Sequence, residues 1–452
     1  MNKFRFSLAM ITGKTMIRLM RLMKRNATNL PGSVALSICP DMLSGFTMPE
    51  NVIVVTGTNG KTTVTNMLGG ILKKKGLNVI TNSFGGNVNT GIANLFIDHS
   101  KLNGTVKADI ALIEMDERSA PRVLPFVKPD YLLCTNLQRD SMKRNASPEF
   151  IFNLLDRNIP SKTTLILNAD DLISSRLAEG NKRAYFGIDL LEGEVPTTDN
   201  LICDVKICPE CGTVMEYKFK HYNHIGQAFC PECGLKNPES DFQITKSDGE
   251  NVSIRHNGSE EVYPLPNNRI TDMYNTAAVT AFLRTFGFSE EDVRTGLDGA
   301  EIVKSRFETF TSHGREVFIT LAKGQNPVAC SAAFDFVRKS EGKKAVVLIV
   351  EDACYRQQSS ENIAWIYEAD FEFLKGDDIE QIIVGGERCQ DFLVRMLLAG
   401  IDRDKISICM SESDVASQIK WESFEKLFIL YHFYNTDALL NLKKQIQEGG
   451  TK

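Results

Sequence analysis

The residues best suited to chemistry form a short turn between an apolar run and an amphipathic segment. The turn contains Gly57, Gly60, Lys61 and Thr62. Glycines let backbone N–H groups face a phosphate, and the helix expected to follow adds its positive dipole. Lys61 can reach the outer phosphates and Thr62 can bind Mg²⁺. We interpret the turn as a shortened nucleotide-binding loop, rather than an ordinary glycine turn before a helix. Its full set is Gly57, Thr58, Asn59, Gly60, Lys61, Thr62 and Thr63.

A carboxylate downstream is the expected partner of this loop. Glu114 ends the apolar run Leu112-Ile113 and is followed by Met115-Asp116-Glu117. A carboxylate at the end of a buried strand is costly unless it binds a cation or a donor. We therefore expect Glu114 and Thr62 to hold Mg²⁺ beside the phosphates. The alternative is a solvated acidic strand end without a ligand.

Four cysteines have the spacing of a structural zinc site. The sequence Cys-Pro-Glu-Cys-Gly occurs twice, with eighteen residues between the second and third cysteine. Four thiolates leave no open position on the metal, so zinc bound here has a structural role. The alternative is two redox or incidental pairs. The predicted zinc ligands are Cys208, Cys211, Cys230 and Cys233.

Alternating strands and helices are expected to position these groups. Short apolar runs at 51–55, 78–81, 110–113, 131–134 and 164–167 alternate with helical stretches such as 64–75 and 148–156. This alternation predicts a parallel α/β sheet. Residues 200–240 interrupt the alternation, and a second α/β unit begins near residue 309. We predict an N-terminal helix and lead-in at 1–45, a central nucleotide-binding domain at 46–305 with an inserted zinc ribbon, and a Rossmann-like C-terminal domain at 306–452.

Composition favours a soluble globular protein. The 452 residues are 42% hydrophobic and 24% charged, with a net charge of −5, so the chain has no electrostatic bias towards nucleic acid. The scattered cysteines outside the zinc pattern, without a secretion signal, indicate reduced thiols and a cytoplasmic location.

The N-terminus differs from the rest of the chain in charge. Asp41 is the first acidic residue, and seven Lys or Arg residues precede it among apolar side chains. This pattern predicts a basic amphipathic helix. Two interpretations are open: the helix packs on the main body, or it contacts an anionic membrane surface, at the inner face of the membrane.

The loop 57–63 is typical of Mur ligases and folylpolyglutamate synthases, and segments along nearly the whole chain resemble the MurT family. The zinc ribbon inside a Mur ligase ATPase domain is the most specific shared feature. The similar segments are Asn29–Gly32, Glu114–Glu117, Thr135–Asp140, Leu167–Asp171, His221–Gly226, Tyr274–Ala278, Leu321–Lys323, Trp365–Glu372 and Gly385–Arg388.

The MurT resemblance implies a reaction and a partner. ATP would phosphorylate the α-carboxylate of D-glutamate in the lipid II stem peptide, and ammonia would convert the acyl phosphate to D-isoglutamine. The ammonia would come from a separate glutaminase subunit related to class I glutamine amidotransferases, forming a heterodimer. The resemblance also assigns Asn136, Asn275 and Arg306 to the nucleotide site, with Asn275 near the adenine.

One departure from the family affects the coupling to glutamine. Three residues before Trp365, the family has an aspartate that completes the partner's Cys-His pair, but this chain has Asn362. Asparagine can orient a histidine but cannot stabilise an imidazolium as a carboxylate does. Glu361 and Glu368 are the nearby carboxylates that could substitute.

The departure keeps other functions open. A divergent Mur ligase paralogue with another carboxylate or amine is one alternative, and a nucleotide-binding scaffold with weakened catalysis is another. A zinc-ribbon nucleic-acid binder is disfavoured by the overall acidity and the intact phosphate loop.

Overall fold

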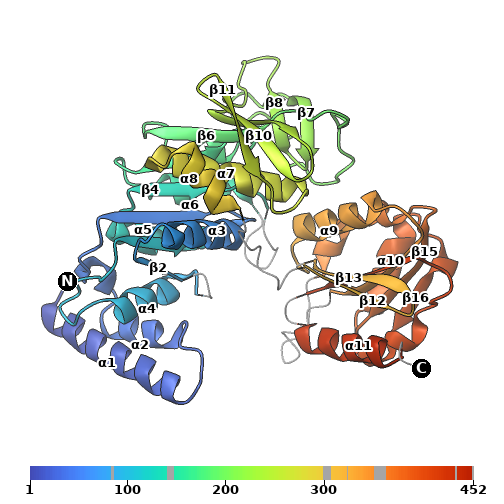
Figure 1. Ribbon diagram of the computed structural model, residues 1–452, viewed down its shortest axis with the longest axis horizontal. Helices are drawn as coiled ribbons and strands as arrows, with labels where there is room; N and C mark the ends of the chain where they lie inside the picture. Colours follow the sequence, from blue (N-terminus) through green and yellow to red (C-terminus); the bar gives the residue numbers. More distant parts are fainter. Residues whose placement is uncertain are drawn as a thin grey trace. The chain divides into compact units, whose positions relative to one another are not determined.

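The computed structural model describes residues 1–82, 86–139, 147–298, 307–322, 324–350, 363–432 and 435–449. The chain divides into two compact units (Figure 1). Unit 1 comprises Met1–Gln138, Ser147–Thr198 and Asp204–Ile302. Unit 2 comprises Arg139–Ala146, Asp199–Cys203 and Val303–Lys452.

A nine-stranded sheet forms the centre of unit 1, in the order β11-β10-β9-β6-β5-β4-β1-β3-β2. The strands from β2 to β9 in this order are parallel, and β10 and β11 add an antiparallel edge. The strands are β1 (Asn51–Thr56), β2 (Val79–Thr81), β3 (Ile110–Glu114), β4 (Tyr131–Cys134), β5 (Thr164–Asn168), β6 (Arg183–Ile188), β9 (Phe242–Ser247), β10 (Asn251–His256) and β11 (Ser259–Pro264).

Helices cover both faces of this sheet because its central strands are apolar on both sides. In β1, Val52 and Val54 pack into one core layer, and Ile53 and Val55 pack into the other. The first layer contains α1 (Lys3–Leu22), α2 (Leu30–Ile38), α4 (Asn89–His99), α5 (Ala120–Val127) and α6 (Pro148–Asp156). The second layer contains α3 (Lys61–Lys74), α7 (Ile270–Phe286) and α8 (Glu290–Leu297).

The interruption of the α/β pattern is a small hairpin within unit 1. Strands β7 (Glu216–Tyr222) and β8 (Ile225–Phe229) form their own two-stranded antiparallel sheet. The hairpin has a separate small apolar cluster that includes Val205, Met215 and Ala228. This hairpin, with its flanking cysteine turns, is called the ribbon below.

Unit 2 is a second α/β layer structure. Its six strands have the order β12-β13-β17-β14-β15-β16, with β12 antiparallel to β13 and the others parallel. The strands are β12 (Phe307–Ser312), β13 (Arg315–Leu321), β14 (Lys344–Ile349), β15 (Ile379–Gly385), β16 (Ile406–Cys409) and β17 (Lys426–Tyr431). Helices α9 (Pro327–Lys339) and α10 (Cys389–Leu398) pack in one core, and α11 (Thr436–Gly449) packs in the other.

The predicted α/β fold class is confirmed. Each apolar run expected as a strand before residue 170 is one, although β1, β3 and β5 each extend one residue further than expected and β2 begins one residue later. The sequence reasoning missed β6 and β11. β6 begins with Arg183 and is interrupted by Gly187, and β11 begins with Ser259, Glu260 and Glu261, so neither strand is a run of branched apolar residues.

Gly32 allows α2 and α4 to pack closely. A Cβ atom at Gly32 would lie 1.9 Å from the backbone oxygen of Thr90.

Gly32→Ala should therefore lower the free energy of unfolding by about 1–3 kcal/mol, because rigid backbone would have to move. Urea unfolding followed by circular dichroism measures this change. Gly70→Ala is the matched control: nothing lies within 4 Å of its Cβ position in α3, and it should stabilise the chain by about 0.5–1 kcal/mol. Equal effects of the two substitutions would contradict the packing argument.

Candidate nucleotide site and cysteine cluster

The turn between β1 and α3 can be formed only with glycine at two positions. Gly57 has φ +123° and Gly60 has φ +89°, in the region that other residues rarely adopt. A Cβ at Gly57 would lie 2.2 Å from Thr135 Oγ1, and one at Gly60 would lie 2.5 Å from Asn275 Oδ1. The second close approach places Asn275, on α7, directly beside the loop.

The segment that follows β4 holds the loop in place. The backbone N–H of Thr58 donates to the Asn136 carbonyl at 2.8 Å, and the Gln138 N–H donates to Thr58 Oγ1 at 2.9 Å. The Asn59 N–H donates to Asn136 Oδ1 at 3.1 Å, and Thr135 Oγ1 donates to the Asn59 carbonyl at 2.6 Å. These bonds fix the loop backbone before a phosphate arrives, which is the preorganisation that phosphate binding requires.

Lys61 lies at the start of α3 and pairs with Glu117. Its Nζ lies 2.9 Å from Glu117 Oε1 and also donates to the Gly57 carbonyl. Burial lowers the pKa of Lys61, but the carboxylates of Glu117 and Asp116 outweigh this and hold that pKa above its ordinary value. Burial also raises the pKa of Glu117, against the pull of Lys61. The environment of Lys61 therefore favours its protonated form, and its ammonium group lies against the phosphate loop.

Glu114 and Thr62 meet beside Lys61. Thr62 Oγ1 donates to Glu114 Oε1 at 3.2 Å, and Asn87 Nδ2 donates to the same oxygen at 3.1 Å. Asn82 fixes the backbone of Glu114 from both sides, accepting from its N–H and donating to its carbonyl, each at 2.8 Å. A buried carboxylate and a hydroxyl give the oxygen ligands that Mg²⁺ prefers, so these residues fit the expected ion.

The other predicted site residues fall into three groups. Asn136 and Asn275 lie against the loop, as described above, and Thr63 lies in the first turn of α3. Arg306, Glu361 and Asn362 lie outside the described residues. Glu368 caps a short 3-10 turn, η7 (Ala364–Tyr367), and its Oε1 accepts from Arg139 Nη1 at 2.7 Å within unit 2.

Sequence reasoning missed several residues that shape the site. Glu117 stands three positions after Glu114 and begins the 3-10 turn η2 (Glu117–Ser119), which returns its carboxylate to Lys61. Its membership of an acidic cluster after a buried strand was the available signal. Asn82, Asn87 and Gln138 gave no such signal, since their partners lie far away in sequence.

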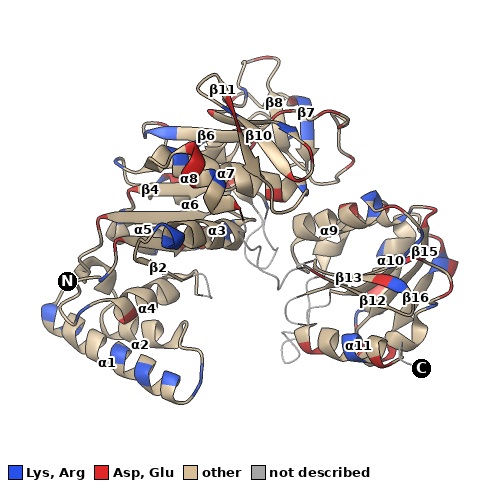
Figure 2. Ribbon diagram, viewed as in Figure 1, with Lys and Arg blue, Asp and Glu red and all other residues tan. Residues whose placement is uncertain are grey.

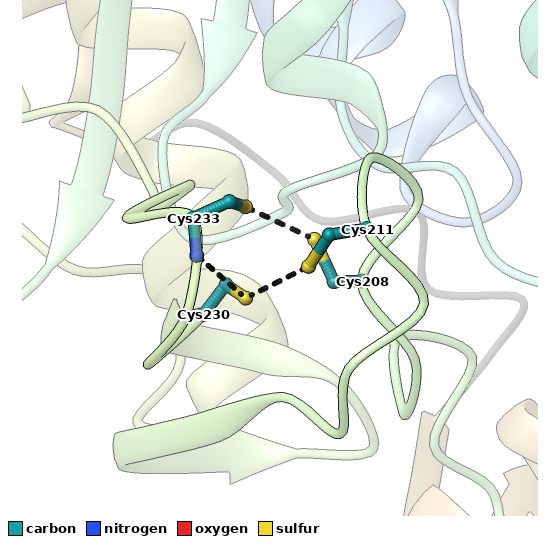
Figure 3. A group of neighbouring side chains, drawn as sticks. All are labelled: Cys208, Cys211, Cys230 and Cys233. Atoms are coloured by element: carbon teal, nitrogen blue, oxygen red, sulfur yellow. Dashed lines mark hydrogen bonds between the residues drawn. The ribbon is translucent and has the colours of Figure 1, made fainter.

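The structure brings the four ribbon cysteines together (Figure 3). Their sulfur atoms lie within 4.8 Å of one another, with Cys208 Sγ 3.6 Å from Cys233 Sγ and Cys211 Sγ 3.4 Å from Cys230 Sγ. A tetrahedral site with metal–sulfur bonds of about 2.3 Å would place its sulfurs about 3.8 Å apart, so the four thiols fit one metal ion.

The two turns that carry these cysteines have the same local structure. In the first, the Cys208 N–H donates to the Thr213 carbonyl and the Gly212 N–H to the Cys208 carbonyl. The second repeats this pattern with Cys230, Leu235 and Gly234. Both glycines have φ +76°, which explains the glycine after each Cys-x-x-Cys. The backbone of each turn thus requires glycine at the fifth position of the repeated motif.

Two buried aspartates after β5 connect the ribbon to the nucleotide loop. Asp171 Oδ2 accepts from the Leu137 N–H at 2.6 Å, and its Oδ1 lies 3.2 Å from Nε2 of His224, which is in the ribbon. Asp170 accepts from Gln227 Nε2 and from the Tyr274 hydroxyl, each at 2.8 Å. Burial raises the pKa of Asp170. Tyr274 precedes Asn275 on α7. The two aspartates therefore anchor both segments that contact the loop, the segment after β4 and helix α7.

Asp171→Asn tests this connection. Asp171 accepts from the Leu137 N–H through one oxygen and from the Ile173 N–H through the other, and an amide has only one oxygen. One of these backbone donors therefore loses its partner, and the free energy of unfolding should fall by about 1–3 kcal/mol. Urea unfolding at neutral pH measures it. Asp189→Asn is the control, because among the described residues that partly exposed carboxylate accepts only from the adjacent Leu190 N–H, and it should cost less than about 0.5 kcal/mol. A neutral effect of Asp171→Asn would show that the connection contributes nothing.

Two family models match the chain. The Mur ligase middle domain matches residues 55–191, and the MurT ligase C-terminal domain matches residues 323–435. In the solved structures, a pseudomurein peptide ligase type C from Methanothermus fervidus has a TM-score of 0.68 at 20% identity, covering 90% of this chain and 81% of that one. MurF from Thermotoga maritima in complex with ADP has a TM-score of 0.57 at 16% identity, covering 93% and 85%. These likenesses show the Mur ligase fold.

Two curated relatives are more similar in sequence. The MurT subunit of lipid II isoglutaminyl synthase (glutamine-hydrolyzing) from Staphylococcus aureus is 32% identical over 385 residues, covering 84% of this chain and 85% of that protein. The corresponding subunit from Streptococcus pneumoniae is 30% identical over 432 residues, covering 94% of each. With the nucleotide loop and the cysteine ribbon inserted in the same domain, this similarity shows that the chain belongs to the MurT family of Mur ligase-like proteins.

Proposed function

We propose that the chain is the ATP-dependent amidoligase subunit of a lipid II isoglutaminyl synthase. Its substrate would be the α-carboxylate of D-glutamate in the lipid II stem peptide, and its product D-isoglutamine. The observation that carries the proposal is the preorganised loop, in which Lys61 and the Thr62–Glu114 pair lie together in a chain of the MurT family.

The chemistry requires a better leaving group than a carboxylate oxygen. A carboxylate oxygen attacks the γ-phosphorus of ATP, the bond from that phosphorus to the β–γ bridging oxygen breaks, and ADP leaves. Ammonia then attacks the carbonyl carbon of the acyl phosphate, the carbon–oxygen bond to phosphate breaks, and the nitrogen loses a proton as the amide forms. Each step moves negative charge that the site must stabilise.

The residues of the loop have separate parts in this reaction. The N–H groups at the start of α3 would bind the phosphates, while Asn136 and Gln138 hold the preceding loop in place through their bonds to Asn59 and Thr58. Lys61 would exchange its contact with Glu117 for the outer phosphates and follow the charge as it moves. Thr62 and Glu114 would hold Mg²⁺, which neutralises phosphate charge when bound. Asn275, which lies beside Gly60, would contact the nucleotide.

We infer that Cys208, Cys211, Cys230 and Cys233 hold a structural zinc ion. Four thiolates leave no position for water or substrate, so the metal would stabilise the ribbon and take no part in the reaction.

The ammonia would come from a glutaminase partner, and the reaction would take place on the cytoplasmic side of the membrane. Asn362 and Glu361, the residues expected to face the partner, lie outside the described part of the chain. Glu368 is described, and its carboxylate is engaged by Arg139. Asparagine replaces the family aspartate, so one alternative is a ligase that uses glutamine weakly and depends on free ammonium. Another alternative is a ligase that acts on a different carboxylate.

Amidation of lipid II by the purified chain tests the proposal directly. ATP and ammonium should give D-isoglutamine without a partner, and glutamine should replace ammonium once the glutaminase is added. Activity with ammonium alone would mean an intact ligase with coupling weakened at Asn362. Activity with neither nitrogen source would overturn the proposal in favour of another substrate or a scaffold.

Removing the Lys61 charge should abolish turnover. The double variant Lys61→Met with Glu117→Gln removes both charges, so no buried ion is left unpaired and the fold should be retained. ATP turnover should fall by at least about 100-fold, because the moving phosphoryl charge loses its cation. Unchanged turnover would contradict the loop assignment, and Lys73→Met, an exposed lysine of the same helix, should have no effect.

Replacing Cys208 and Cys211 with Ser should release the metal. Wild type should contain about one zinc per chain by elemental analysis, and the variant close to none, since two of the four ligands are lost. The ribbon should then exchange its amide hydrogens faster, because metal binding contributes to folding. Cys203→Ser, outside the cluster, should keep its zinc. A wild-type chain without zinc would refute the assignment.

A further inference from the structure

Helix α1 has two apolar faces, and packing uses only one of them. Its inner face is buried against the first core layer of unit 1 through Phe6, Ala9, Met10, Gly13 and Ile17. Five large apolar side chains remain exposed on the same helix. They are Phe4 (77% exposed), Leu8, Ile11, Leu19 and Leu22 (80% exposed).

The exposed residues form a stripe. Positions 4, 8, 11, 15, 19 and 22 follow the three- and four-residue spacing of one helix face, with Thr15 the only polar member. Single exposed apolar residues are normal on any surface and need no explanation. An apolar face along the full length of a helix, opposite its buried face, is the kind of surface that binds a partner.

The charges around the stripe identify the partner. Lys14 and Arg21 are bound to the chain: Lys14 donates to the carbonyls of Ile97 and Ser100, and Arg21 pairs with Asp98. The other basic residues are exposed and form no ion pair with any described residue. They are Lys3, Arg5, Arg18, Lys24 and Arg25. Figure 2 shows Lys and Arg along α1 and no acidic residue.

Such a helix suits the surface of a bilayer and not its interior. Among the described residues, no helix is both long and apolar enough to cross a membrane. A helix that combines an apolar stripe with basic flanks lies in the plane of the headgroups, with the stripe towards the acyl chains. The exposed cations then meet anionic lipid headgroups, and each adds to the attraction.

We propose that the outer face of α1 docks this protein on an anionic lipid bilayer. A second copy of the chain is a poorer occupant, because two such faces would bring their exposed cations together. The docking does not depend on the proposed amidation, but it would hold the nucleotide site near a substrate embedded in lipid.

Binding to vesicles of equal parts phosphatidylcholine and phosphatidylglycerol tests the proposal. The test variant combines Leu8→Gln, Ile11→Gln and Leu19→Gln, which are 45–53% exposed, so the inner face is untouched and a good helix former is introduced. The matched control combines Val394→Gln, Leu398→Gln and Leu440→Gln in unit 2, which are 50–69% exposed. A second variant, Arg5→Gln with Arg18→Gln, tests the charges.

Wild type and the control should sediment with the anionic vesicles, and binding should weaken with salt and with phosphatidylcholine alone. The apolar variant should bind at least about tenfold more weakly, and the charge variant, which keeps three of the five exposed cations, should bind more weakly at low salt and show a smaller salt dependence. No binding by wild type, or equal loss in the test and control variants, would overturn the proposal. So would a wild-type dimer that the apolar variant abolishes, since the stripe would then be a contact between copies.

An activity measurement separates this proposal from the proposed function. The apolar variant should amidate a water-soluble muropeptide with ATP and ammonium as fast as wild type, but should amidate lipid II in vesicles more slowly. If the muropeptide reaction fails in wild type, the proposed function is wrong and vesicle binding still decides the docking.

Discussion

The burial of two adjacent aspartates just after β5 determines how the other parts of unit 1 are assembled. Both are fully buried, and burial of a carboxylate is costly unless donors surround it. The donors come from the parts that must be assembled: the turn after β4, helix α7, strand β6 and the ribbon. Satisfying Asp170 and Asp171 therefore sets the position of each part relative to the sheet. The nucleotide loop lies between two of these parts, the turn at Asn136 and Gln138 and the helix position of Asn275.

This arrangement gives the ribbon a part in the nucleotide site although it contributes no residue to it. His224 contacts Asp171, Asp171 accepts from the Leu137 N–H, and the next residue, Gln138, binds Thr58 of the loop. A metal held by four thiolates would stiffen the far end of this series of contacts. Lys61 and Glu117 complete the site as an ion pair, in which Lys61 can exchange its contact with Glu117 for a contact with phosphate. The surrounding acidic residues raise the pKa of Lys61 and so favour its protonated form. The geometry suits a ligase that must stabilise moving phosphoryl charge before any acyl group is transferred.

Local patterns in the sequence predicted much of this, and long-range contacts account for what they missed. The nucleotide loop and the cysteine turns were visible because their function requires particular residues at fixed spacing, as the positive φ angles of Gly57, Gly60, Gly212 and Gly234 explain. The strands before residue 170 were visible as continuous apolar runs. Glu117 and Asp171 were not singled out, because their roles depend on partners more than thirty residues away. For α1 the pattern left packing and membrane contact as alternatives, whereas the structure shows one face packed and a second apolar face exposed, so the two are compatible.

If this chain activates a carboxylate by phosphorylating it, an oxygen atom of that carboxylate must leave with the phosphate. Lipid II labelled with ¹⁸O in the α-carboxylate of its D-glutamate would be incubated with the chain, ATP and ammonium, and the released phosphate analysed by mass spectrometry. Activation by phosphorylation predicts one ¹⁸O atom in phosphate for each amide formed, because the bond that breaks joins the carbonyl carbon to the labelled oxygen. Amide formation with unlabelled phosphate, or ATP turnover without any amide, would contradict it.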